Sequence, residues 1–221
     1  MYEQIVAALP DFWVALGESL YMLLVTIPLT ILLGIPLGTL LYYTRPGSSL
    51  HAPRTYLILN GIVNLIRSFP FIILLIAIIP LTRLIVGTAL GTTAVIVPLT
   101  INAIPYFARF VEQTLLEVNR GLIEAAEAMG ANKFQVIWKV LYSEGRVGIA
   151  NSITIITVSF FSYSSMAGLV GGGGLGDFAI KYGYNRYQTY VMGFTIVVIV
   201  FFVQGFQFIG NYFVRKLDKR L

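Results

Sequence analysis

The stretch that decides the fold reads Glu124-Ala125-Ala126-Glu127-Ala128-Met129-Gly130-Ala131, and it lies in the polar segment 112–146 of a very apolar chain. Leu122, Ala126 and Met129 recur at helical spacing, and Gly130 stands where a left-handed residue would end the helix. The segment carries too much charge to lie in lipid. It therefore predicts a short amphipathic helix between membrane spans.

A second short helix is expected directly after this one. Asn132 can cap its N-terminus. Its apolar stripe consists of Phe134, Ile137, Trp138 and Leu141, and Lys133, Gln135 and Lys139 lie on the opposite side. We therefore expect residues 119–142 to form a compact helix-turn-helix with a partly apolar surface, suited to docking a soluble partner.

The composition is that of a membrane protein. The 221 residues are 57% hydrophobic and 11% charged, with a mean hydropathy of +0.81, outside the usual range of soluble domains. The chain is long enough for one domain of several helices and too short for an added catalytic domain. It contains no cysteine, which excludes disulfides and thiolate metal sites. No metal site is predicted.

Five membrane-spanning helices are predicted from the long intervals that carry little or no charge. These intervals are 19–44, 55–82, 84–116, 147–169 and 188–214. Pro28, Pro36 and Pro70 predict kinks within the first two spans. Gly34 and Gly38 form a GxxxG pattern that favours close helix packing over a dimer interface. The expected fold class is an all-α membrane protein.

Basic residues predict the orientation, because cytoplasmic loops of membrane proteins are enriched in Lys and Arg. An odd number of spans places the two termini on opposite sides. With the C-terminus in the cytoplasm, the cytoplasmic basic residues are Arg45, Arg54, Arg120, Lys133, Lys139, Arg146, Arg215, Lys216, Lys219 and Arg220. Only Arg83, Lys181 and Arg186 are then left outside. We expect N-out and C-in, with residues 119–142 in the cytoplasm. This pattern explains the +5 net charge better than a nucleic-acid surface does.

The fourth span carries a row of polar residues that suggests a path through the membrane. Asn151, Thr154, Ser162 and Ser165 fall roughly on one helical face. Such a row either lines a polar passage or makes interhelical hydrogen bonds. Ser162, Ser165 and Met166 lie three or four residues apart near the outer end. Met166 is a candidate gate residue, and core packing is the alternative.

Arg67 is the one charge within the second predicted span and has no acidic neighbour in sequence. An intramembrane arginine is costly unless it faces water, a helix end or a partner. It is therefore a candidate pathway residue, with a structural role near the headgroups as the alternative.

Two patterns typical of enzymes do not support an enzyme here. Gly171, Gly173 and Gly176 satisfy GxGxxG, but they follow a membrane span and lack the strand and acidic residue of a dinucleotide site. We interpret them as a flexible outer turn. The chain has no GxxxxGK[ST] loop and no Ser/His or His/Glu constellation. Any ATP chemistry must therefore belong to a partner.

The residues of the central stretch are similar to the EAA signature of bacterial ABC importer permeases, EAA-x3-G-x9-I-x-LP. Glu124-Ala125-Ala126 and Gly130 match it, Val140 replaces the isoleucine, and Tyr142-Ser143 replace the final Leu-Pro. Further segments resemble the permeases of methionine ABC importers. They are Tyr43-Thr44-Arg45-Pro46-Gly47, 67–75, Ile79-Pro80-Leu81-Thr82-Arg83, Val97-Pro98-Leu99-Thr100, 121–125, 171–176 and Tyr182-Gly183-Tyr184.

This resemblance implies a type I ABC importer permease in the bacterial cytoplasmic membrane. It implies two copies of the chain, an ABC ATPase dimer that holds ATP and Mg²⁺, and an extracytoplasmic substrate-binding protein. The segment 119–142 would be the coupling element, with Glu124, Ala125, Ala126, Gly130 and Ala131 docking the ATPase. Methionine is the expected substrate, and another amino acid or small organic solute is the alternative. A channel or secondary carrier independent of ATP would be a different class; it predicts internal repeats or paired intramembrane charges, which are not evident.

Overall fold

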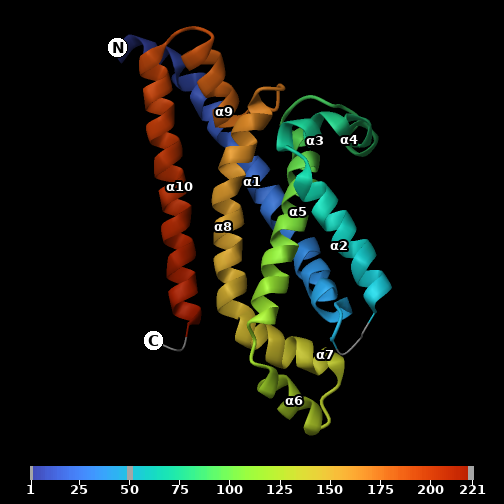
Figure 1. The fold of residues 1–221 in the computed structure, drawn as a ribbon. Coiled ribbons are helices and arrows are strands. Elements are labelled where there is room, and N and C mark those ends of the chain that lie inside the picture. The colour runs from blue at the N-terminus through green and yellow to red at the C-terminus, as the bar shows by residue number, and fades with distance from the viewer. Residues whose placement is uncertain (1, 49–51, 219–221) are drawn as a thin grey trace.

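The computed structural model describes residues 2–48 and 52–218, and these residues form helices and turns without any strand. The long helices run side by side along one axis (Figure 1). The described chain begins at one end of the bundle and ends at the other. The helices α6 and α7 lie at the C-terminal end, whereas α3, α4 and α9 lie at the opposite end.

The first helix, α1 (Tyr2–Thr44), is one continuous helix of 43 residues. It begins well before residue 19, where the first span was expected to start. The added N-terminal part is stabilised by packing, because Ala8, Phe12 and Ala15 are buried in a cluster with Leu175 and Phe178. The expected start was set by the acidic residues Asp11 and Glu18. In the structure these two carboxylates accept hydrogen bonds from Tyr182 and Gly174.

The glycines of α1 mark its closest contact with α5 (Thr92–Leu116). A Cβ atom added to Gly34 would lie 2.6 Å from the Phe107 ring, and one on Gly38 would lie 2.5 Å from the Ala108 carbonyl oxygen. The GxxxG pattern therefore serves helix packing within the chain, as the sequence indicated.

The predicted span 55–82 is corrected by the structure to separate helices. The helix α2 (Pro53–Ser68) ends at Phe69, and α3 (Phe71–Ala77) continues at an angle of 107° to it. Pro70 disfavours a helical conformation at the residue before it, and Phe69 is accordingly extended, with φ −77° and ψ 130°. The short α4 (Ile79–Val86) then follows.

The predicted span 84–116 begins later than expected, at Thr92. The left-handed Gly87, with φ 84°, caps α4, and Gly91 also has a positive φ of 94°. These two glycines form the turn before the long helix α5.

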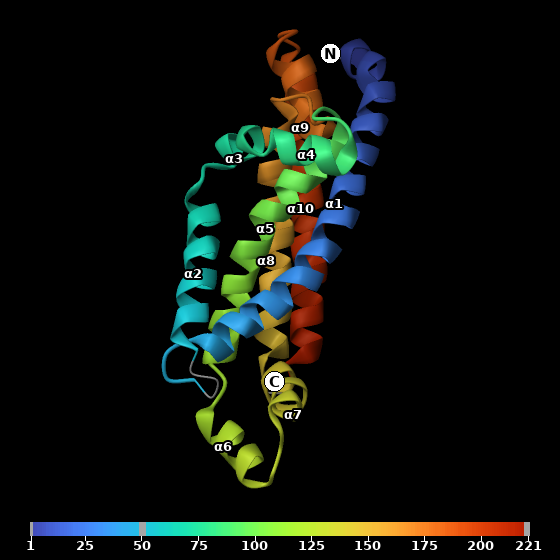
Figure 2. The same cartoon turned by 90° about the vertical axis from the view of Figure 1, so that its right-hand side faces the viewer.

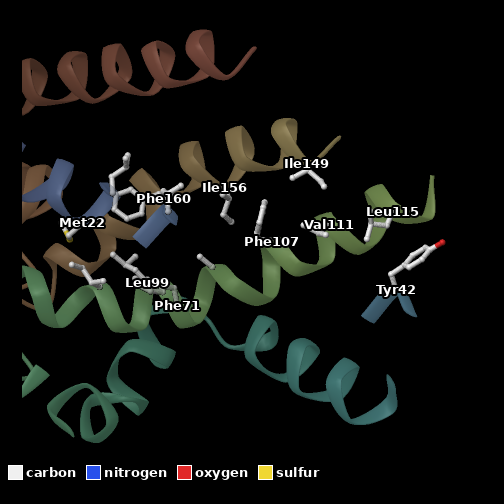
Figure 3. Packing of buried hydrophobic residues seen from close by; sticks show 14 of the residues in the cluster. Met22, Tyr42, Phe71, Leu99, Phe107, Val111, Leu115, Ile149, Ile156 and Phe160 are labelled. Atoms are coloured by element: carbon white, nitrogen blue, oxygen red, sulfur yellow. The ribbon is translucent and has the colours of Figure 1, made fainter. Parts of the chain in front are cut away.

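The main hydrophobic core lies where α1, α5 and α8 (Tyr142–Gly168) meet. Phe107, Val111 and Leu115 are fully buried along one side of α5 (Figure 3). The rings and side chains of Ile149, Ile156 and Phe160 approach them from α8. Burial of this apolar face fixes the three helices relative to one another.

The last helix, α10 (Thr189–Leu217), packs against α8 and the preceding π-helix η2 (Ala179–Tyr184), and most of its apolar surface is exposed. Four helices of the described chain are long and apolar enough to cross a membrane, and the bent pair α2–α3 would make a fifth span. Figure 2 shows α2 at the left edge of the bundle, beside α5.

The expected helix-turn-helix is present within 119–142. It consists of α6 (Arg120–Ala128), α7 (Lys133–Gln135) and the π-helix η1 (Val136–Leu141), which leads directly into α8. Because η1 and α8 are continuous, a force applied to this element acts on a spanning helix.

Candidate functional site: the coupling element and the polar residues of the bundle

The turn between α6 and α7 has the geometry that its sequence predicted. Gly130 has a φ of +84°. The Ala131 amide donates to the Ala126 carbonyl at 3.0 Å, and the Gly130 amide donates to the Glu127 carbonyl at 2.9 Å. This pair of hydrogen bonds is a Schellman motif, which satisfies the last carbonyls of α6. The left-handed glycine is therefore confirmed.

The following helix begins with a capping box. The Gln135 amide donates to the side chain of Asn132, and the Asn132 amide donates to the side chain of Gln135, both at 2.9 Å. Reciprocal bonds of this kind fix the direction in which the chain enters a helix. The two caps together hold α6 and η1 in one defined arrangement.

An apolar surface is exposed on this element, and we call it the docking surface. Its members are Leu122, Met129, Phe134 and Trp138. Met129 is 83% exposed and Trp138 59% exposed. A hollow of about 370 Å³ next to Met129 lies between the two helices. Met129 is the member of the docking surface that lines this hollow. Large apolar side chains that are left exposed in this way are typical of a protein interaction site.

The five predicted docking residues do not all face outward. Glu124, Ala125 and Gly130 are exposed, Ala131 is half-buried, and Ala126 is buried against the core. Glu124 makes no hydrogen bond or ion pair with the described part of the chain, and it lines a small hollow with Tyr43 and Arg45 at the end of α1. Ala126 therefore fixes the helix, and Glu124 is available to a partner.

The polar residues predicted to form a row on α8 differ in their exposure and in their contacts. Asn151, Ser162 and Met166 are exposed, Met166 by 41%. Thr154 is buried and packs where Gly210 of α10 leaves room for it. Ser165 is half-buried and donates to the carbonyl of Phe161 in its own helix at 2.8 Å. Thr154 thus makes a contact with α10 and Ser165 a bond within α8, and all five residues stay predicted pathway candidates.

The glycine run after α8 is a packed turn and not the flexible one expected. Gly171, Gly173 and Gly174 have positive φ angles. The Glu18 carboxylate accepts the Gly174 amide at 2.7 Å, and the Ser19 hydroxyl accepts the Leu175 amide at 2.9 Å. These bonds hold the turn and α9 (Gly174–Phe178) onto α1.

Acidic residues gather at the N-terminal end of the bundle around a hollow of about 270 Å³. It is lined by Asp11, Glu18 and Asp177 together with Lys181. Burial raises the pKa of the Asp177 carboxyl, and the nearby Lys181 opposes that change. The Tyr182 hydroxyl donates to Asp11, a bond that raises the pKa of the tyrosine. The sequence offered no pattern that marked this group.

Arg67 lies in the last turn of α2, with its guanidinium carbon 4.9 Å from the centre of the Tyr106 ring. A second arginine at the α2–α5 contact was not predicted. Arg109 donates to Glu112 at 2.5 Å and to Asn64 at 3.0 Å, and it also bonds Asn60. The i, i+4 spacing of the two asparagines on α2 is the sequence signal that could have indicated this network.

Comparison with known proteins defines the class. The chain belongs to the family of binding-protein-dependent transport system inner membrane components, whose sequence model matches residues 30–221. It is therefore a membrane transport component of the bacterial inner membrane.

Two relatives at high identity carry a more specific name. The chain is 50% identical over 206 residues to the probable D-methionine transport system permease protein MetI of Vibrio cholerae, covering 93% of this chain and 92% of the relative. It is 44% identical to the protein of the same name from Pasteurella multocida, covering 96% of this chain and 99% of that one.

Solved structures share the fold. A chain of the inward-facing MetNI methionine ABC transporter superposes with a TM-score of 0.94 at 43% identity, covering 96% of this chain and 99% of its own length. A chain of an amino acid ABC transporter solved with histidines has a TM-score of 0.77 at 18% identity, covers 98% of both chains, and shows the likeness of fold alone. The fold is that of type I ABC importer permeases.

Proposed function

We propose that this chain is the membrane-spanning subunit of an ATP-driven methionine importer. The observation that carries the proposal is the docking surface on an element that is continuous with α8. Relatives named for D-methionine transport, at 44–50% identity over nearly the whole chain, support the substrate. A preference for the D-enantiomer, which the names of those relatives state, is part of the same proposal.

The assembly in this proposal has two copies of the chain, an ABC ATPase dimer and an extracytoplasmic binding protein. The ATPase holds ATP and Mg²⁺ and contacts the docking surface and Glu124. When the ATPase dimer closes, α6 and η1 move with it, and α8 moves with η1. Alternating access follows, because binding of nucleotide favours one arrangement of the helices over the other.

The proposed topology has five spans with the N-terminus outside and the C-terminus inside, and α2 with α3 makes the second span. It places the docking surface on the same side as Arg215 and Lys216 of α10. Those basic residues favour the cytoplasm. The outer end then carries the acidic hollow and the glycine turn, where the binding protein would deliver substrate.

Topology and partner are tested together. Single cysteines replace Tyr184, the last residue of η2 before α10, and Lys216 in the last turn of α10, and both positions are exposed. Intact cells are then treated with a thiol reagent that does not cross membranes. Tyr184→Cys should react from outside, and Lys216→Cys only after permeabilisation. The cognate ATPase should purify with the chain. Reversed labelling, or transport without an ATPase, would refute the proposal; the latter would indicate a channel or secondary carrier.

Specificity is tested by competition. An excess of unlabelled methionine should abolish the uptake of labelled methionine, whereas an excess of another amino acid should not. If another solute is transported instead, the importer class stands and the substrate assignment is wrong.

A further inference from the structure

A polar cluster lies inside the bundle where α2 ends and α3 turns away. The Tyr106 hydroxyl of α5 donates to the Arg67 carbonyl of α2 at 3.1 Å, and the Arg67 guanidinium lies over the Tyr106 ring. Asn102 lies one helical turn before Tyr106. Tyr163 of α8 neighbours both Asn102 and Tyr106, and its ring centre is 5.3 Å from that of Phe71. Three helices thus bring their polar groups together.

Two buried donors of this cluster, the Arg67 Nε and the Asn102 Nδ2, make no well-formed hydrogen bond. The Tyr163 hydroxyl is the acceptor next to Asn102, whereas the Arg67 Nε has no acceptor among the described residues. Asn102 is only 2% exposed, so its amide cannot turn to solvent. A buried donor without an acceptor loses its hydration and gains nothing in return. Both groups are N–H donors, so the missing partner must be an acceptor.

Because the Arg67 side chain is positively charged, an anion is the acceptor that suits it best. Arginine stays protonated in proteins, and no carboxylate of the described residues lies within 4 Å of its guanidinium. The contact with the Tyr106 ring supplies attraction but no hydrogen-bond acceptor. A planar guanidinium and an amide N–H group suit a carboxylate.

Arg109 shows that the chain can satisfy an arginine at the same helix pair when the role is structural. Its guanidinium bonds Glu112, Asn60 and Asn64. Arg67 lacks any such set. The difference distinguishes a structural arginine from one that is left open for a ligand.

We propose that Arg67 and Asn102 form a transient subsite for the α-carboxylate of the transported amino acid, with Tyr106 and Tyr163 beside it. This inference rests on the proposed function. Tyr163 lies three residues before Met166, so the subsite is near the proposed outer part of α8. Substrate released at the outer end would pass it. The subsite would hold the carboxylate of the substrate while the outer path closes.

The test uses the assembled complex of permease, ATPase and binding protein in proteoliposomes. A diazirine analogue of methionine is irradiated during ATP turnover, and the labelled peptides are mapped by mass spectrometry. The wild-type label should fall on α2, α5 and α8 around the cluster. Arg67→Gln and Asn102→Leu should each reduce that label on the order of tenfold, because a charge-assisted or buried hydrogen bond is lost. Labelling of the binding protein should be unchanged.

Ser68→Ala is the matched control. Ser68 is the next residue on α2 and is exposed, and its hydroxyl donates within its own helix to Asn64. It should label like the wild type. Arg67→Lys keeps the charge without the planar fork and should give an intermediate value.

The outcomes separate the two proposals. Wild-type label elsewhere in the chain, or undiminished label at the cluster in either variant, overturns the subsite even if uptake falls, since the residues would then be structural. A wild-type complex without ATP-driven methionine uptake instead contradicts the proposed function.

Discussion

The hydroxyl oxygens of Thr39 and Tyr142 lie 2.7 Å apart and join α1 to the first residue of α8. Thr39 also donates to the carbonyl of Ile35 at 2.8 Å, so its single proton is used and Tyr142 is the donor to Thr39. The Trp138 ring packs edge-on against Tyr142, with centroids 5.2 Å apart. The docking surface is thereby connected to the longest helix of the bundle.

This hydrogen bond predicts a measurable coupling energy. Tyr142→Phe and Thr39→Val should each destabilise the purified complex, and the double variant should be less destabilised than the sum, by about 1 kcal/mol. Thr30→Val is the control, because buried Thr30 bonds only the Thr26 carbonyl of its own helix. Additive effects of Tyr142→Phe and Thr39→Val on unfolding would show that the two hydroxyls do not interact.

The Gly130 turn predicts a graded loss of docking. Gly130→Val should reduce ATPase association and uptake, because a β-branched residue is strongly disfavoured at a φ of +84°. Nothing lies within 4 Å of an added Cβ atom, so the strain comes from the backbone alone. Gly130→Asn should retain most of the activity, since asparagine tolerates this conformation.

Both Gly130 variants should still insert into the membrane, because no spanning helix is altered. Co-purification of the ATPase with each variant provides the measurement. If the Gly130→Val variant associated fully with the ATPase, the Gly130 turn would not be needed for docking.

The glycine turn after α8 is predicted to depend on Glu18. Glu18→Ala removes the acceptor of the Gly174 amide, and hydrogen exchange in the peptide that contains Gly174 should accelerate on the order of tenfold. Glu18→Gln keeps a side-chain oxygen and should be closer to the wild type. Unchanged protection in Glu18→Ala would mean that packing, and not this bond, holds the turn.

Met166 is predicted to act at the outer gate. It is unbranched and flexible, and in a two-fold dimer it would meet its own counterpart. Met166→Ala should leave assembly intact and raise the amount of ATP hydrolysed per methionine transported. Met166→Cys should cross-link the two copies more readily at rest than with nucleotide trapped. Absence of cross-links in both states, with coupling unchanged in Met166→Ala, would assign Met166 to helix packing.

Local chemistry made the coupling element predictable from the sequence. Gly130, Asn132 and Gln135 act through hydrogen bonds to residues only a few positions away. The apolar length of the spanning helices was equally visible. Their ends were less so, because α1 continues outward through contacts with residues more than 150 positions away, such as Leu175 and Phe178.

The polar groups within the bundle were only partly predictable. Arg67 was visible as a lone charge in an apolar interval, but its contact Tyr106 is 39 residues away on another helix. The row on α8 was predicted from spacing alone, and spacing cannot tell which of two neighbouring helices covers Thr154. Gly210 on α10 decides that point. The break at Phe69 was underestimated, because a proline predicts a kink without its angle.

The central claim is that ATP hydrolysis by a partner drives methionine through this chain. Proteoliposomes that contain the permease, its ATPase and internal ATP are supplied with binding protein and labelled methionine outside, and accumulation is measured over time. Accumulation should require all three proteins and ATP, and it should fall strongly in Gly130→Val. Methionine entry that is equally fast without ATP or without the ATPase would contradict the account.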